Sequence, residues 1–182
     1  GVAPITLELV GSTNRVELIG SNFGGPLSLR APWIETTTST FNNTTSLVMN
    51  GGSTVTNDGG NTFNGTTLID HQGSAEWRWA NNIGDVFNGE VTFKKSGAGR
   101  LYPVYNQRSY FNGVVNVDYP GGGQLDFGPR NTAIVEFNGG VSQTFNVASG
   151  TGIPLFGDVT VNNTTGGNLT LNTPIIIDGN LE

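Results

Sequence analysis

Charged side chains recur at one position of a repeating sequence, and their types suit the cleavage of sugar chains. Asp70, Lys94 and Asp118 each lie at the same offset after a Phe, and Val48 holds the same position one repeat earlier. A surface column of Asp and Lys on a β-helix is typical of polysaccharide lyases and hydrolases. The alternative is a charge ladder that fixes the register of stacked coils, worth under about 1 kcal/mol per exposed pair. We favour the ladder.

Glycosidases use two carboxyl groups, one on each side of the glycosidic bond that is cleaved. Stacking at the β spacing places Asp70 and Asp118 about 9–10 Å apart, which reaches the range of inverting enzymes. Lys94 lies between them, however. Asp126 and Asp118 share a coil, but nothing in the sequence raises the pKa of either carboxyl, as a general acid would need. We therefore expect no enzymatic activity, with polysaccharide cleavage kept as the alternative.

Nucleophilic and metal chemistry find little support. His71 is the only His, no Gly-x-Ser-x-Gly elbow is present, and the chain has no Cys. A Ser-His-Asp triad and a zinc or copper site are therefore not predicted. Asp, Asn and carbonyl oxygens leave room for structural calcium. No EF-type or Asp-rich nonapeptide loop occurs, so we assign no metal site and no cofactor.

Aromatic side chains gather in the second strand of the repeats, where alternation separates an inner from an outer set. Trp77, Trp79 and Phe127 share the inward parity and are expected in the core. The opposite parity predicts an outward cluster that could stack on a sugar ring and bind its hydroxyls. Its members are Tyr102, Arg78, Asp126 and Gln124.

A repeat positions all of these residues. Five Phe-Asn pairs follow one another along the chain at nearly equal steps. We expect the rings to stack inside the fold and the amides to form a corner ladder, each donating to the next coil. The rings are Phe41, Phe63, Phe87, Phe111 and Phe137. The amides are Asn42, Asn64, Asn88, Asn112 and Asn138.

Each repeat contains two or three short strands separated by polar corners. Apolar residues alternate after each Phe, a Gly-rich break follows, and a second short strand comes next. The Gly after each Asn from Gly65 to Gly139 predicts a corner of positive φ. A third corner is expected to align four amides. They are Asn61, Asn82, Asn106 and Asn131.

The fold class is therefore all-β, a parallel β-helix (β-solenoid) of about seven coils with about 24 residues each. A β-sandwich is the alternative, because short strands with regular turns also suit it. Residues 1–182 are interpreted as one domain, with irregular coils in 1–40, regular repeats in 41–142 and C-terminal coils in 143–182. A distortion is expected between Gln143 and Pro154. The final strands lack a polar cap, so we expect the chain to be part of a longer protein.

Composition excludes other classes. The net charge is −6 and the eight Lys and Arg residues are scattered, which disfavours nucleic-acid binding. No apolar run is long enough to cross a membrane, so membrane insertion is not expected. Gly, Asn, Thr and Ser make up nearly half of the chain, and this mixture disfavours long helices.

The repeat Thr62-Phe-Asn-Gly-Thr-Thr67 resembles long arrays in giant cell-surface and secreted, adhesin-like proteins of Bacteroidetes bacteria. The ending from Phe156 to Leu181 is similar to segments that follow such arrays. The resemblance covers about residues 40–182. It implies an extracellular or cell-surface location, an adhesive or spacer role, and other domains of the same long chain as partners. It carries over no catalytic residue.

The function we expect is structural: to extend, display or adhere. A carbohydrate-binding or carbohydrate-cleaving β-helix, with surface glycans as partners, is the alternative. A module that associates with itself through its open ends or edges is a third option.

Overall fold

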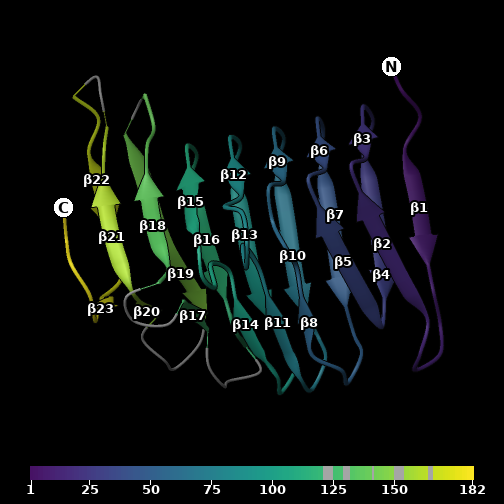
Figure 1. Ribbon diagram of the computed structural model, residues 1–182. Helices are drawn as coiled ribbons and strands as arrows, with labels where there is room; N and C mark the ends of the chain where they lie inside the picture. The colour runs from purple at the N-terminus through teal and green to yellow at the C-terminus, as the bar shows by residue number, and fades with distance from the viewer. Residues whose placement is uncertain (121–124, 129–131, 141, 150–153, 164–165) are drawn as a thin grey trace.

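The chain folds into a β-solenoid of about seven turns, stacked in a row with the two termini at opposite ends (Figure 1). The computed structural model describes residues 1–120, 125–128, 132–140, 142–149, 154–163 and 166–182. These residues form 23 strands and no helix, and no segment among them qualifies as a membrane-spanning helix. Every strand pairing is parallel, which confirms the predicted β-helix. The β-sandwich alternative is wrong, since sandwiches are built from antiparallel sheets.

Seven coils each contribute one strand to each of three faces, which the chain visits in turn, and the last two strands begin one more turn. The first face is an eight-stranded sheet. Its strands are β1 (Ile5–Glu8), β4 (Leu27–Ala31), β7 (Thr45–Met49), β10 (Thr67–His71), β13 (Val91–Lys95), β16 (Val115–Asp118), β19 (Gln143–Ser149) and β22 (Leu169–Leu171).

The second face consists of three smaller sheets, and the third face is again one sheet of seven strands. The second face holds β2 (Arg15–Ile19) with β5 (Trp33–Thr37), then β8 (Val55–Thr56), β11 (Glu76–Arg78) and β14 (Arg100–Tyr102), then β17 (Asp126–Phe127), β20 (Leu155–Phe156) and β23 (Ile176–Ile177). The third face holds β3 (Asn22–Phe23), β6 (Thr40–Phe41), β9 (Thr62–Phe63), β12 (Val86–Phe87), β15 (Arg108–Phe111), β18 (Ile134–Phe137) and β21 (Asp158–Val161).

Coil length varies while the register of the first face is kept. Thr67, Val91 and Val115 are successive partners at equal steps, but the coil that joins Val115 to its next partner, Phe145, is longer. The pairing of β16 with β19 also slips by one position after Val117. The expected distortion near Gln143 is therefore present, although residues 150–153 lie outside the described residues.

A stack of phenylalanine rings runs through the core beneath the third face. The rings of Phe41, Phe63, Phe87 and Phe111 lie nearly parallel, with centroids 4.7–5.1 Å apart. Phe23 extends the stack by one coil, which the sequence did not predict because the step from Phe23 to Phe41 is shorter than the others. Phe137 ends it, tilted by 37° at 6.0 Å. The predicted core positions of Trp77, Trp79 and Phe127 are confirmed by their complete burial.

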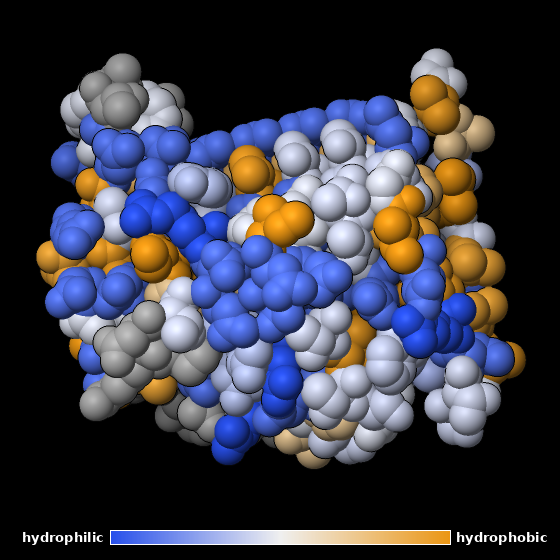
Figure 2. Space-filling view, viewed as in Figure 1, coloured by the Kyte–Doolittle hydropathy of each residue, from blue (hydrophilic) through white to orange (hydrophobic). Residues whose placement is uncertain are grey.

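The asparagine ladder forms along the corner after the third face. It differs from the prediction in the direction of its hydrogen bonds and in which residues end it. Each amide donates to the preceding coil, not the next, from Asn112 back to Asn42, at 2.7–2.8 Å. The last bond goes from Asn42 to Asn22. Asn138 does not continue the ladder, because Oδ1 of Asn112 has no partner. Figure 2 shows hydrophilic surface along this edge, over the turns that follow β6 to β15.

The expectation of positive φ at the corner glycines is wrong. Gly65, Gly89, Gly113 and Gly139 are absent from the residues with positive φ. Close approach of neighbouring coils explains three of them instead. A Cβ would lie 2.7 Å from the carbonyl oxygen of Asn43 if placed on Gly65, 2.6 Å from that of Gly65 if placed on Gly89, and 2.4 Å from that of Gly89 if placed on Gly113. A side chain there would push successive coils apart.

The end coils expose apolar side chains that the inner coils bury. On the N-terminal side these include Ile5 and Leu7 of β1, and on the C-terminal side Leu171 of β22, whose partners on the neighbouring coil are buried. The inward columns therefore run to both ends of the described solenoid without a polar cap.

Replacing Phe87 with Ala tests the ring stack. Phe87 is 1% exposed and lies between two stacked rings, so we expect a loss of about 3–5 kcal/mol in the free energy of unfolding. Urea unfolding measures this, with Thr92→Ala on the outward side of β13 as the control. A loss below about 1 kcal/mol for Phe87→Ala would place the ring outside the core.

Replacing Gly89 with Ala tests the close approach of coils. We expect a loss of at least about 2 kcal/mol, because the new Cβ meets backbone atoms of the preceding coil. Gly24→Ala is the matched control: its Cβ meets only Val2 at 3.7 Å, so stability should be unchanged or slightly higher. Equal effects of the two substitutions would contradict the packing described.

Candidate functional site

The outward cluster predicted from alternation lies on the second face, but its aromatic ring is covered. Tyr102 is only 9% exposed, so the expectation that it faces solvent is wrong. The turn after β14 places Tyr105 edge-on against it, with centroids 5.3 Å apart, and Arg100 donates to the Tyr102 hydroxyl at 3.2 Å. Asp126 is also buried, at 7% exposure, and Gln124 lies outside the described residues.

Arg78 is drawn into the same cluster and has its charge balanced there. Its guanidinium lies 4.7 Å from the centre of the Tyr105 ring, and its Nε donates to Glu76 at 2.9 Å. The structure thus brings Arg78 and Tyr102 together, in register on β11 and β14. These groups already bind one another, so the cluster packs against the second face and does not form an open binding site.

The charged column on the first face has the predicted register. Asp70, Lys94 and Asp118 are direct partners on β10, β13 and β16, and Lys94 forms an ion pair with Asp118 at 3.4 Å. Asp70 accepts hydrogen bonds from Gln72 at 2.6 Å and Ser96 at 2.9 Å. These contacts have the geometry of the coil-fixing ladder.

A buried polar column at the corner between the second and third faces was missed. Backbone N–H groups donate from one coil to the side chain of the next: Ser39 to Asn61 at 3.1 Å, Asn61 to Asp85 at 2.9 Å, and Asp85 to Ser109 at 3.1 Å. All four residues are buried. The signal was available, because each member has the same offset before a Phe of the stack.

The third corner expected from the Asn residues is wrong. Asn82 donates to Asp58 and Asn106 donates to Asn81, each at 2.8 Å, while Asn61 belongs to the buried column. Asn131 lies outside the described residues. Aligning the Asn residues by type failed here, because the turns between the second and third faces differ in length from coil to coil.

Asp85 is the one acid among the four residues of that column. Burial raises the pKa of Asp85 to about 7, although hydrogen bonds from the backbone and side chain of Asn61, both 2.9 Å, oppose the rise. Its second oxygen, Oδ2, is buried without a hydrogen-bond partner. A neutral carboxyl thus fits this position at mildly acidic pH.

The single His is a core residue. His71 is fully buried, its Nε2 lies 2.7 Å from the carbonyl oxygen of Ala75, and burial lowers its pKa. Its register partner Lys95 is also inward and buried, and donates to the carbonyl of Gly97 at 2.5 Å. Burial lowers the pKa of Lys95 too. Within the described residues no three His, Asp or Glu side chains converge as a metal site would require.

Comparison with known proteins returned no match from family models, from curated sequences or from solved structures. The geometry of the chain itself therefore carries the functional argument.

The raised pKa of Asp85 predicts that the free energy of unfolding increases as the pH falls. The pKa of its carboxyl is about 3.8 when unfolded and about 7 when folded, so folding binds a proton between these values. Raising the pH from about 4 to about 8 should cost up to about 4 kcal/mol at this site. Asp85→Asn keeps an acceptor for Asn61 but cannot ionise. The free energy of unfolding of the variant minus that of the wild type, measured with urea, should therefore increase as the pH rises from about 4 to about 8. The same difference at both pH values would contradict the assignment.

Proposed function

We propose that this chain is a structural and adhesive β-solenoid segment of a large bacterial surface or secreted protein, whose function is to extend and display. The observation that supports this most is the continuity of the first face, whose eight strands pair in parallel from one end to the other. Backbone hydrogen bonds then run along the axis of the rod, where a spacer bears load.

The arrangement of charge and polar groups supports the same role. The described ion pairs join neighbouring strands or residues on one strand, such as Arg108 with Glu136 and Arg15 with Glu35. The corner amides bind one another along the axis. These groups contribute to coil register, as a scaffold requires.

Polysaccharide cleavage is the competing function. The column of Asp70, Lys94 and Asp118 would supply its groups, yet Lys94 is paired with Asp118 and Asp70 is held by two hydrogen bonds. Incubation with polysaccharides should leave polymer length unchanged. Shortening of the polymer by the wild type, and none by Asp70→Asn, would favour the enzymatic function.

A solenoid spacer should tolerate removal of one whole coil. Deleting residues 65–88 joins Asn64 to Gly89 and keeps each inward column in register, so we expect a folded chain, shorter by about 4.8 Å. The slope of its urea unfolding should fall by roughly one seventh. Circular dichroism and small-angle scattering measure the fold and the length.

Deleting residues 65–76 is the matched control for that experiment. It removes half a coil, so the columns no longer align, and the variant should not fold. A whole-coil deletion that unfolds like the half-coil deletion would contradict the modular rod.

A further inference from the structure

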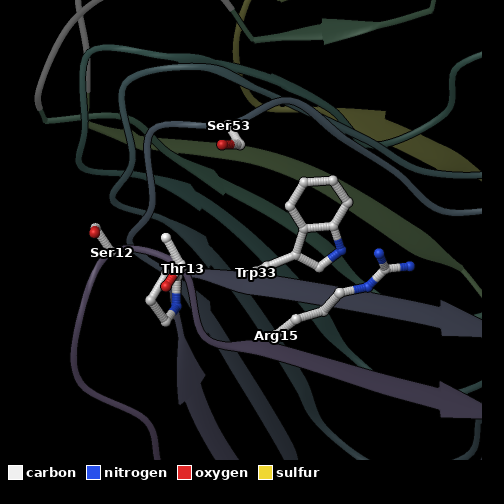
Figure 3. Close-up of a pocket in the computed structure, with 6 residues that line it drawn as sticks. Ser12, Thr13, Arg15, Trp33 and Ser53 are labelled. Carbon is white, nitrogen blue, oxygen red and sulfur yellow. The ribbon is translucent and has the colours of Figure 1, made fainter.

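A second arginine–aromatic pair on the second face lies beside an open hollow, in the N-terminal coils where the Phe-Asn repeat is least regular. The hollow has a volume of about 290 Å³. Figure 3 shows the Trp33 ring between Ser53 and Arg15, with Ser12 and Thr13 across from it. Pro32 completes the lining.

Strand register fixes the aromatic wall of this hollow. Trp33 on β5 is the direct partner of Arg15 on β2, and both belong to the outward side of their strands. The Arg15 guanidinium lies 5.0 Å from the centre of the Trp33 ring and binds Glu35 at 3.0 Å. The ring nitrogen points toward Arg15, and the six-membered ring extends toward Ser53 (Figure 3). The indole is thus held upright at the edge of the hollow.

The hollow is open because no turn of the described chain covers it, as a comparison with Arg78 and Tyr105 on the next sheet of this face shows. There Arg78 lies over Tyr105, and the turn that carries Tyr105 covers Tyr102. Beside Trp33 the residues across the hollow are Ser12, Thr13 and Ser53, all exposed and all small. No large side chain among them fills the space in front of the ring.

The lining suits a sugar ring. A pyranose has a face of C–H groups that can pack on an indole, and a rim of hydroxyls that can bond with Ser and Thr hydroxyls or a guanidinium. The volume lies at the lower end of the range for small-molecule pockets, so it suits one or two sugar units and not a larger cofactor.

Charge selects among sugars. Arg15 contacts two carboxylates, Glu17 and Glu35, so the cluster carries one net negative charge. The whole chain is also acidic, at −6. An anionic sugar or a phosphate would be repelled at this position.

We propose that the hollow formed by Trp33, Arg15, Ser12, Thr13 and Ser53 is a binding subsite for a neutral pyranose unit of a glycan. The site goes beyond the scaffold role and does not depend on it, since a spacer without a ligand would have the same fold.

Tryptophan fluorescence tests the subsite directly. The chain has three Trp residues, of which Trp77 and Trp79 are fully buried, so a ligand on the surface should change the emission of Trp33 alone. Soluble mannan, galactan, xylan and glucan are the neutral probes, and alginate and heparin are the anionic ones. We expect a saturable change with at least one neutral polymer and none with the anionic polymers.

Two variants separate loss of the site from loss of the fold. Trp33→Ala removes the aromatic wall, and Ser53→Leu fills the hollow while keeping Trp33. Each should weaken binding at least tenfold, measured by affinity electrophoresis, with the circular dichroism spectrum unchanged. Tyr105→Ala, on the covered cluster, is the matched control and should bind as the wild type does.

Three results would overturn the proposal: no response to any neutral polymer, a response only to the anionic polymers, or binding that survives in Ser53→Leu. Failure here leaves the coil-deletion result untouched, so the subsite and the scaffold role are judged separately.

Discussion

Parallel pairing of each coil with the next is the constraint on which the rest of the structure depends. It places equivalent residues about 4.8 Å apart, so any side chain meets its own counterpart on both sides. Flat rings and amides gain from that repetition, as the stacked Phe centroids and the asparagine bonds show. Where neighbouring backbones approach closely, as at Gly89 and Gly113, only glycine fits.

Variation in coil length is confined by the same constraint. The first and third faces each remain one continuous sheet, while the second face breaks into three sheets. The extra residues lie between strands, both next to the second face and, in the longest coil, between Phe137 of the third face and Phe145 of the first. Side chains on the second face therefore escape strict repetition, and both arginine–aromatic clusters lie there. The face that is least regular in backbone is thus the one with room for specific chemistry.

The columns that share a residue type and a constant step could be predicted from the sequence. The Phe stack, the corner amides and the Asp70–Lys94 register follow from equal spacing. The covering of Tyr102 could not be predicted, because it depends on how the turn bearing Tyr105 folds back.

Two further features escaped prediction for different reasons. The buried column through Asn61 and Asp85 mixes residue types, so only its constant offset from Phe could reveal it. Trp33 lies outside the regular repeat, and its pairing with Arg15 joins two strands that share no repeated motif. Repetition in the sequence thus predicts the scaffold, while the candidate binding residues lie where repetition fails.

Distances between paired spin labels test the solenoid most directly, since the chain has no Cys of its own. Ser28, Thr92 and Asn146 share one outward column, with Thr92 three coils and Asn146 five coils from Ser28. Labels on the pairs Ser28–Thr92 and Ser28–Asn146 should be about 14 Å and about 24 Å apart, rising by one β spacing per coil. Equal distances, or a shorter one for the second pair, would contradict the stacked coils.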